Sequence, residues 1–320
     1  MKLRCDFCYR HCQLEEGQTG LCGVRTHKEG KLITSGYGAL VSLAVDPVEK
    51  KPLYHFLPGS RTMSIAMFGC NLTCQFCQNY LISQSDFAGV IAGQPVDIQE
   101  IIDGAKDRHC PSISFTYSEP LVWQDYMLEV AKRAKQEGLA TIMVTNGTFS
   151  EEALARIVPW IDAYNIDLKG DESFYHRLCG GSDEPVLEAI RYIGRTKAHL
   201  EVTTMVMESM HTLSMIETLA HALHERGVQV WHLSRFFPNY HCTEAETSES
   251  FLRQALEAAR TGSIPYIYAG NSGMDQSTYC PSCHELLVTD RIRSSIHVLP
   301  TLKQGRCSSC RYPIYGRFGS

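Results

Sequence analysis

The sequence predicts an α/β fold in which a parallel sheet, closed fully or partly into a barrel, is covered by helices. Two observations between about residues 60 and 272 favour it: seven short β-rich runs follow one another, and helical patterns separate them. Strand and helix in repeated alternation are typical of a parallel sheet. A third observation is that no G-x-G-x-x-G motif follows the first run, which disfavours a dinucleotide-binding Rossmann fold. A barrel carries its chemistry at the C-terminal ends of its strands.

The expected strands are short runs rich in β-branched and aromatic residues. In chain order they are "SIAMF" (64–68), "SISFTY" (112–117), "TIMVT" (141–145), "AYNIDL" (163–168), "EVTTMVM" (201–207), "VWHLS" (230–234) and "PYIYA" (265–269).

The expected helices are recognised by apolar residues that recur three or four positions apart and so share one face. Two such sets are Val122, Tyr126, Val130 and Ala134, and Ile216, Leu219, Ala220 and Leu223. Start signals agree with this reading. Asp97 with Glu100 resembles a capping box, and Ser150 precedes "EEALARIV", which has two acidic residues in its first turn.

Composition limits the function classes. The chain has 320 residues, of which 44% are hydrophobic, and a formal net charge of −5, so no overall basic field favours nucleic acid or an anionic membrane. We find no run of 18 apolar residues, and the start "MKLRCDFCYRHC" lacks the apolar core of a signal peptide. We therefore expect a cytoplasmic protein without a membrane partner, whose thiols are reduced.

The 14 cysteines are strongly clustered. In a reducing compartment, clustered cysteines are metal ligands rather than disulfides. Three groups with three different spacings predict three distinct sites. Cys110, Cys179 and Cys242 stand alone, and we interpret them as small buried hydrophobic residues.

The central group is "FGCNLTCQFCQN", which places Cys70, Cys74 and Cys77 directly after the first predicted strand. A [4Fe–4S] cluster normally takes four thiolates, so three would leave one iron open to an exchangeable ligand. The alternative is a zinc site completed by a distant residue such as His109 or His55.

The motif "CNLTCQFC" resembles the C-x3-C-x-aromatic-C signature of radical S-adenosylmethionine (SAM) enzymes. The chain is most similar to pyruvate formate-lyase activating enzyme-like proteins. Within that group it resembles the AmmeMemoRadiSam-system radical SAM protein through "CDFCYRHCQLEEGQTGLCGVR", "DPVEKKPLYHFLPGS", "FCQN", "SFTYSEP", "VTNG", "NIDLKG" and "SRFFPNY". These motifs span nearly the whole chain, in order.

The resemblance implies a partial (β/α)6 barrel that holds a [4Fe–4S] cluster and SAM. It implies that SAM binds the open iron and that its reduction yields a 5′-deoxyadenosyl radical, which abstracts hydrogen from a protein, peptide or other macromolecular substrate. An electron donor such as flavodoxin or ferredoxin is implied, and so are links to Memo-like and AMMECR-domain proteins.

The resemblance also implies roles for residues near the cluster. Phe76 matches the position whose backbone meets the adenine of SAM. Glu119 in "YSEP" is expected to accept the SAM ammonium, and a carboxylate suits such a charge-assisted bond. The alternative for Glu119 is a residue that only caps the following helix. Thr145 and Asn146 can hydrogen-bond the ribose or the SAM carboxylate.

Asp167 and Lys169 in "NIDLKG" resemble the pair of residues that lies near the SAM carboxylate in the activases. One residue departs from the family pattern. Glycyl-radical activases commonly have Asp-Thr-Asn-Gly where this chain has Val144, which weakens the prediction of a glycyl-radical enzyme as the substrate.

Substrate residues are harder to identify. Polar side chains alternate along the late strands, so that one set points into the predicted barrel. The candidates, each of which could equally be structural, are Glu201, Thr203, His232, Ser234 and Arg235.

Residues 274–320 contain "CPSC" and "CSSC", and they predict a zinc-ribbon-like domain. Two C-x2-C pairs of this kind close a structural zinc site, here from Cys280, Cys283, Cys307 and Cys310. A segment this short has too little core to fold without such a staple. Its small excess of basic residues does not favour nucleic-acid binding.

Residues 1–59 form an N-terminal cysteine-rich segment and a linker, followed by the barrel over residues 60–273. Cys5, Cys8, Cys12 and Cys22 are spaced more tightly than in a zinc ribbon. Zinc and a second [4Fe–4S] cluster both remain open for this group, with zinc preferred. The alternative to an enzyme is a non-catalytic metal scaffold, whose zinc modules bind a partner or nucleic acid.

Overall fold

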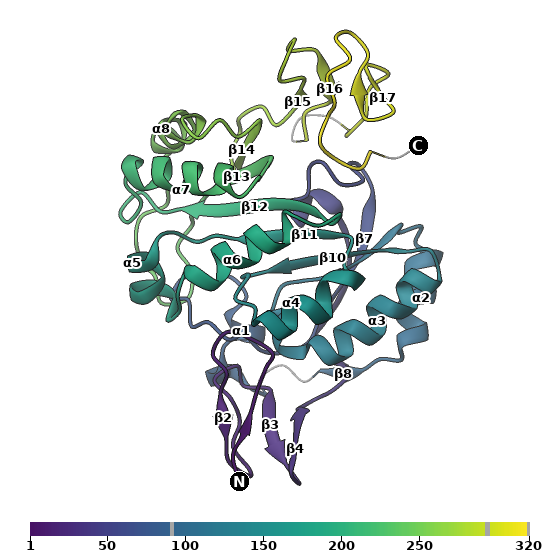
Figure 1. Cartoon of the computed structure of the whole chain (residues 1–320), viewed down its shortest axis with the longest axis vertical. Helices are drawn as coiled ribbons and strands as arrows, with labels where there is room; N and C mark the ends of the chain where they lie inside the picture. The colour runs from purple at the N-terminus through teal and green to yellow at the C-terminus, as the bar shows by residue number, and fades with distance from the viewer. Residues whose placement is uncertain (90–92, 292–294, 319–320) are drawn as a thin grey trace.

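A computed structural model describes residues 1–89, 93–291 and 295–318. Its centre is an eight-stranded sheet in the order β14-β13-β12-β11-β10-β9-β7-β6 (Figure 1). The strands are β6 (Ser42–Pro47), β7 (Arg61–Ala66), β9 (Ser112–Phe115), β10 (Ala140–Thr145), β11 (Ala163–Asp167), β12 (His199–Val206), β13 (Val230–Arg235) and β14 (Tyr266–Gly270).

Seven of these strands run parallel, and only β6 pairs antiparallel, with β7. Each of the seven parallel strands overlaps one of the seven β-rich runs of the sequence, although β7 begins at Arg61, before the predicted run 64–68. Within the described residues, β6 and β14 are the two ends of the sheet, so the sheet does not close into a full barrel.

Helices connect the parallel strands. They are α1 (Tyr80–Ser83), α2 (Ile98–Asp107), α3 (Gln124–Gln136), α4 (Glu151–Ile157), α5 (Glu172–Phe174), α6 (Glu184–Ile193), α7 (Leu213–Glu225) and α8 (Glu249–Arg260), with short 3-10 or π turns between some of them. The predicted start signals are confirmed. The Asp97 side chain accepts from Gln99 N at the start of α2, and Ser150 accepts from Ala153 N at the start of α4.

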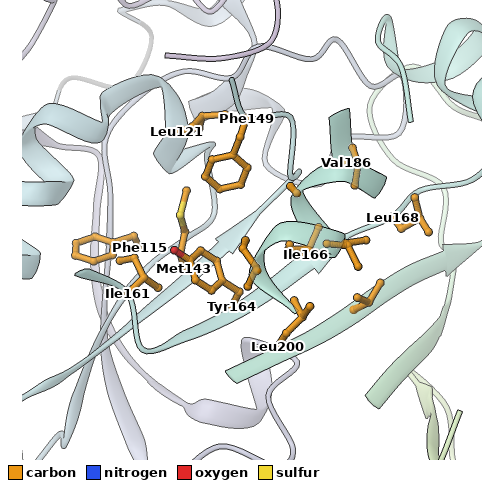
Figure 2. Close-up of a cluster of buried hydrophobic side chains, with 14 of the residues drawn as sticks. Phe115, Leu121, Met143, Phe149, Ile161, Tyr164, Ile166, Leu168, Val186 and Leu200 are labelled. Carbon is orange, nitrogen blue, oxygen red and sulfur yellow. The ribbon is translucent and has the colours of Figure 1, made fainter. Parts of the chain in front are cut away.

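The main core lies between the sheet and its helices. Figure 2 shows side chains from β9, β10 and β11 packed against residues such as Leu121, Phe149 and Val186. Met143, Tyr164 and Ile166 on these strands are fully buried. Cys110, Cys179 and Cys242 are buried as well, as their isolation in the sequence predicts.

The N-terminal segment contains two small antiparallel sheets, purple in Figure 1, which are formed by β1 (Leu3–Arg4) with β2 (Gln13–Leu14) and by β3 (Arg25–Lys28) with β4 (Lys31–Thr34). A third pair joins β5 (Ala39–Leu40) to β8 (Gln94–Pro95). Because β6 is an edge strand of the main sheet, the sheet begins before residue 60.

The linker between β6 and β7 contacts the sheet near the start of β12. There the fully buried Glu201 carboxylate accepts hydrogen bonds from Tyr54 N at 3.0 Å and His55 N at 2.7 Å. The same carboxylate accepts from His199 at 2.8 Å and His232 at 2.6 Å. Four donors therefore hold one buried charge, and two of them come from the linker.

The tail, yellow in Figure 1, lies at the opposite end of the molecule from the N-terminal segment. It contains β15 (Thr278–Tyr279), β16 (Leu286–Val288), β17 (Leu302–Lys303) and β18 (Arg306–Cys307). Leu287, Val288 and Ile314 share a hydrophobic cluster with Tyr54 and Tyr266. The tail therefore packs against both the linker and the sheet. Within the described residues, no helix has the length and apolar composition that crossing a membrane requires.

Candidate functional site

One cavity of about 420 Å³ lies at the C-terminal ends of the parallel strands. The ends of neighbouring parallel strands meet at one edge of a sheet, where α/β proteins gather their chemistry. All nine residues predicted to hold the cluster and SAM line this cavity: Cys70, Cys74, Cys77, Phe76, Glu119, Thr145, Asn146, Asp167 and Lys169.

The three cysteines lie on a loop that follows β7. Gly69, with φ of 116°, starts this loop, and a Cβ there would lie 2.8 Å from Cys22 O, so the turn requires glycine. Thr73 N donates to Cys179 O and Gln75 N donates to Leu178 O, both at 2.9 Å. These bonds hold the middle of the loop against the turn that follows α5.

The sulfurs of this loop receive few protein hydrogen bonds. Leu72 N donates to Cys70 Sγ at 3.4 Å, and the Cys77 sulfur lies 3.1 Å from Ser83 Oγ. Burial raises the pKa of the Cys77 thiol. Three thiols that share a cavity with no acidic partner on the loop suit a metal cluster, which would bind them as thiolates.

Glu119 is buried, and its carboxylate accepts three hydrogen bonds. Its Oε1 accepts from Leu121 N at 3.0 Å and from Thr145 Oγ1 at 2.6 Å, while its Oε2 accepts from Asn146 N at 2.7 Å. Burial raises its pKa to about 7, although these hydrogen bonds oppose the rise. A carboxylate offers about four acceptor positions, so one remains for a further donor. Glu119 therefore both caps the turn at Pro120–Trp123 and lines the cavity.

Asn146 connects the end of β10 to the cysteine loop. Its Nδ2 lies 2.9 Å from Asn71 Oδ1 and 3.7 Å from Cys70 Sγ. The Asn71 amide in turn donates to Thr148 Oγ1 at 2.8 Å. The Asn-Gly sequence directly follows β10, Gly147 has a positive φ of 75°, and Asn146 lines the cavity.

Lys169 provides the cavity with a positive charge. Its ammonium donates to Asp167 Oδ2 at 2.9 Å. Burial would lower the pKa of Lys169, but the Asp167 carboxylate raises it well above the usual range. Phe76 is buried, and its ring centroid lies 5.7 Å from that of Phe174. The Lys169 ammonium and the Asp167 carboxylate therefore line the cavity side by side, and Phe76 lines it from the cysteine loop.

The late-strand candidates separate into two groups. Thr203 and Ser234 line the cavity, whereas Glu201 and His232 belong to the buried network that holds the linker. Arg235 donates to Thr247 O at 2.7 Å and is not part of the cavity lining.

The two histidines considered as a fourth zinc ligand lie elsewhere. His55 bonds Tyr268 and Tyr315, and His109 follows α2 on the surface. Neither is part of the cavity lining in the described chain.

Sequence reasoning missed several cavity residues, including Lys50, Tyr117, Met205 and Asn271. Tyr117 has a positive φ of 69° and donates its hydroxyl to Asp46. Tyr117 is the first residue of the "YSEP" motif, so the sequence motif that identified Glu119 could also have identified Tyr117. Lys50 comes from the linker, and it lies within the quoted motif "DPVEKKPLYHFLPGS", which gave no indication that this residue reaches the cavity.

The N-terminal cysteines share a second, smaller pocket. It is lined by Cys5, Cys8, Cys12 and Cys22 together with Arg25 and Asn71, among other residues. The Nε–H of the buried Arg25 side chain has no hydrogen-bond partner among the described atoms. Burial raises the pKa of the Cys5 thiol, and the positive charge of Arg25 opposes the rise.

The tail cysteines form the tightest group. The sulfurs of Cys280, Cys283, Cys307 and Cys310 all lie within 4.8 Å of one another. Cys280 is 3.5 Å from Cys310, and Cys283 is 3.6 Å from Cys307. Four thiols at this separation can surround a single metal ion.

Comparison with known proteins adds a family and several relatives. The model of the Radical SAM superfamily matches residues 64–234. An uncharacterized protein of Methanocaldococcus jannaschii is 36% identical over 317 residues, which are 97% of this chain and 94% of that protein.

Two further relatives match parts of the chain. A 7-carboxy-7-deazaguanine synthase of Methanothermobacter thermautotrophicus is 32% identical over 128 residues, which are 40% of this chain and 49% of the synthase. A putative glycyl-radical enzyme activating enzyme of Methanocaldococcus jannaschii is 27% identical over 94 residues, which are 29% of this chain and 37% of that enzyme.

Among solved structures, SuiB of Streptococcus suis, determined with bound S-adenosylmethionine, has a TM-score of 0.53 and 14% sequence identity. The match covers 70% of this chain and 53% of SuiB. At this identity the likeness concerns the fold.

Proposed function

This chain belongs to the radical SAM superfamily, and we propose that it cleaves S-adenosylmethionine reductively at a [4Fe–4S] cluster bound by Cys70, Cys74 and Cys77. The family implies an enzyme that uses SAM and such a cluster. When bound and reduced, the cluster and SAM supply a 5′-deoxyadenosyl radical that abstracts hydrogen. The six strand–helix units and the open sheet support the finer description of the fold as a partial (β/α)6 barrel.

One observation carries the proposal: the three thiols share a single cavity with a buried carboxylate, a lysine and an asparagine at the ends of β7, β9, β10 and β11. In this role Glu119 accepts the SAM ammonium at its remaining acceptor position. Lys169 offers its charge to the SAM carboxylate, and Asp167 orients Lys169 through the 2.9 Å bond.

Thr145 and Asn146 complete the binding set. Thr145 already donates to Glu119 and thereby fixes the carboxylate. In this role the backbone of Phe76 meets the adenine. The Asn146 side chain lines the cavity beside the ribose or carboxylate, and it is held there by its bonds to Asn71 at 2.9 Å and from Thr148 Oγ1 at 2.7 Å. Each role concerns binding and orientation, and hydrogen abstraction itself needs no protein acid or base.

The proposed substrate is a protein, a peptide or another macromolecule, as for glycyl-radical activases. The partial similarity to a putative glycyl-radical enzyme activating enzyme supports this class. Val144, which lines the cavity in place of an activase aspartate, counts against the activases' own cation site.

Further components of the proposal concern partners and the tail. An electron donor of the flavodoxin or ferredoxin class would supply the reducing electron in the cytoplasm, and Memo-like and AMMECR-domain proteins would act with this chain. We also propose one structural zinc ion at the tail cysteines, which the short sulfur separations support.

One anaerobic measurement tests the proposal. The full chain, reconstituted with iron and sulfide and reduced with dithionite, should convert SAM into 5′-deoxyadenosine. A protein that binds metal but forms no 5′-deoxyadenosine would instead be a metal scaffold. Electron paramagnetic resonance of cell extracts, with and without this protein, would then test for a dependent glycyl radical.

A further inference from the structure

We propose that Cys5, Cys8, Cys12 and Cys22 bind a second [4Fe–4S] cluster, which passes electrons to the cluster at Cys70, Cys74 and Cys77. The identity of this cluster is inferred from the N-terminal residues themselves. Its role as a relay rests on the proposed function of the main cavity. This inference reverses the preference for zinc that the cysteine spacing alone favours.

The distance between sulfurs distinguishes a site for one metal ion from a site for a cluster. Around a single tetrahedral zinc ion, with zinc–sulfur bonds of about 2.3 Å, neighbouring sulfurs lie about 3.8 Å apart. The tail cysteines meet this condition, with pairs at 3.5 and 3.6 Å. The tail therefore serves as an internal reference for a one-ion site within the same chain.

The N-terminal cysteines do not meet that condition. Although all four line one pocket, no three of their sulfurs lie within 4.8 Å of one another, and the same is true of Cys70, Cys74 and Cys77. Each thiolate around a cubane cluster binds a different iron, so the sulfurs must stand farther apart than around one ion. In this respect the N-terminal group resembles the cysteine loop of the main cavity and differs from the tail.

The N-terminal pocket also contains hydrogen-bond donors that face its sulfurs. Arg25 N donates to Cys22 Sγ at 3.4 Å, and the buried Nε–H of the same arginine has no acceptor among the described atoms. A cluster with four thiolates carries negative charge and additional sulfides, and hydrogen bonds to sulfur are one means by which proteins tune such clusters. Arg25, whose Nη1 also pairs with Asp125 at 3.0 Å, therefore offers the pocket one buried N–H group that has no acceptor among the described atoms.

The N-terminal pocket is connected to the main cavity through Asn71. Asn71 lines the N-terminal pocket, and it follows Cys70 directly in the chain. Asn71 lines this pocket together with Cys8, and its side-chain oxygen accepts from Asn146, whose Nδ2 lies 3.7 Å from Cys70 Sγ. Asn71 therefore connects the N-terminal pocket to a residue that lines the main cavity.

The N-terminal segment is fixed in this position by backbone contacts. Tyr9 N donates to Thr148 O at 3.2 Å, and Ser150 Oγ donates to Asp6 O at 2.5 Å. Cys12 is partly exposed, so a protein donor can approach the pocket from solvent. One electron would leave a low-potential donor of the flavodoxin or ferredoxin class and reduce the second cluster. That cluster would be reoxidised when the electron passes to the cluster at Cys70.

The test uses the full chain with Cys70, Cys74 and Cys77 all replaced by alanine, which leaves only the N-terminal and tail groups. After anaerobic reconstitution we expect about four irons and four sulfides per chain, an electron paramagnetic resonance signal on reduction, and about one zinc. Adding Cys8→Ala and Cys12→Ala should remove the iron, whereas adding Cys242→Ala, a buried cysteine outside both groups, should not. About two zinc ions and no iron in the triple variant would overturn the inference.

A second measurement tests the relay in a chain that keeps Cys70, Cys74 and Cys77. In the Cys8→Ala, Cys12→Ala variant, dithionite should still reduce the main cluster, but reduction by reduced flavodoxin should be lost. Equal reduction by flavodoxin in variant and wild type would overturn the relay. Wild-type protein that makes no 5′-deoxyadenosine even with dithionite would contradict the proposed function instead, and the iron content of the triple variant would be unaffected by that outcome.

Discussion

The hydroxyl of Thr145 lies 2.6 Å from the Glu119 carboxylate and joins the end of β10 to the turn that follows β9. Together with the backbone N–H groups of Leu121 and Asn146, it holds a carboxylate in a buried position beside the cysteine loop.

Replacing Glu119 with glutamine should weaken SAM binding. The loss of one charge-assisted hydrogen bond costs roughly 1.5–3 kcal/mol, so the dissociation constant should rise about 10- to 150-fold. Iron content should not change, because no cysteine is altered. Equilibrium binding of SAM to the reconstituted protein measures the effect. Glu151→Gln, an exposed change in the first turn of α4, serves as the control. Unchanged affinity in Glu119→Gln would mean that Glu119 only caps the turn.

SAM affinity should depend on pH through the same residue. Burial raises the pKa of Glu119 to about 7 from its usual 4.5. Below about pH 7 the carboxyl is protonated and cannot pair with an ammonium, so wild-type affinity should decline on acidification. The decline should be much smaller in Glu119→Gln, and parallel profiles for the two proteins would contradict the assignment.

The raised pKa also sets the sign of a stability effect in the SAM-free protein. The folded state holds the Glu119 proton at pH values where the unfolded chain has released it. The contribution of this group to the free energy of unfolding is therefore present below about pH 4.5 and is lost as the pH rises through about 7. Thermal unfolding of wild type and Glu119→Gln across this window measures the difference between them.

Replacing Cys70, Cys74 or Cys77 with alanine should abolish SAM cleavage and the signal of the main cluster. The fold should persist, because the loop is held by backbone bonds such as Thr73 N to Cys179 O. Electron paramagnetic resonance and 5′-deoxyadenosine formation report the loss, and circular dichroism reports the fold. Cys110→Ala is the control for removing a buried thiol. SAM cleavage by any of the three variants would refute the cluster assignment.

Replacing Cys283 or Cys310 should release the metal of the tail. Both residues are exposed, so the change removes a ligand without opening a core cavity. Metal analysis of the full chain should show a loss of about one zinc, with increased protease sensitivity after residue 274. Ser309→Ala, beside Cys310, should retain the zinc. Iron at the tail of the wild-type protein, or no metal there, would be the contrary result.

Replacing Glu201 with alanine should destabilise the protein by about 3–5 kcal/mol, as expected when a buried hydrogen-bonded charge is removed. Burial raises the pKa of Glu201, but hydrogen bonds from His199 and His232 lower it well below the usual range. Its stabilising effect is therefore present above about pH 4.5 and is lost as the pH falls further. Urea denaturation measures both effects, and the exposed Glu217→Ala should change stability by less than about 0.5 kcal/mol.

The strands and the strand-end residues could be predicted because their signals are local. Thr145 and Asp167 are the last residues of β10 and β11, and Cys70 follows β7 after a short loop. A polar residue or cysteine at the end of a β-rich run thus indicates the C-terminal end of the strand, and the parallel arrangement brings those ends together. The residues that line the cavity are therefore the part of the structure that the sequence predicted most fully.

The contacts of the linker could not be predicted in this way. Tyr54 N donates to the Glu201 carboxylate, which is 147 residues away in the sequence. A periodic pattern of residues predicts helices and strands but does not predict a contact between such distant residues. For the same reason the sequence did not distinguish a substrate-binding role for His232 from a structural one, whereas in the structure His232 hydrogen-bonds the buried Glu201. The separation of the N-terminal sulfurs also depends on tertiary structure, so spacing alone left zinc and a cluster open.

The pairing of the linker with the tail has a consequence for biosynthesis. Leu57 N donates to Arg317 O and Arg317 N donates to His55 O, both at 2.7 Å, while His55 also bonds Tyr315, which lies 260 residues later in the chain. A growing polypeptide cannot make these contacts until the ribosome has released almost its entire length. The linker therefore lacks its hydrogen bonds to the tail during most of translation. A chain that is truncated before residue 315 lacks them permanently, beside the buried Glu201 network.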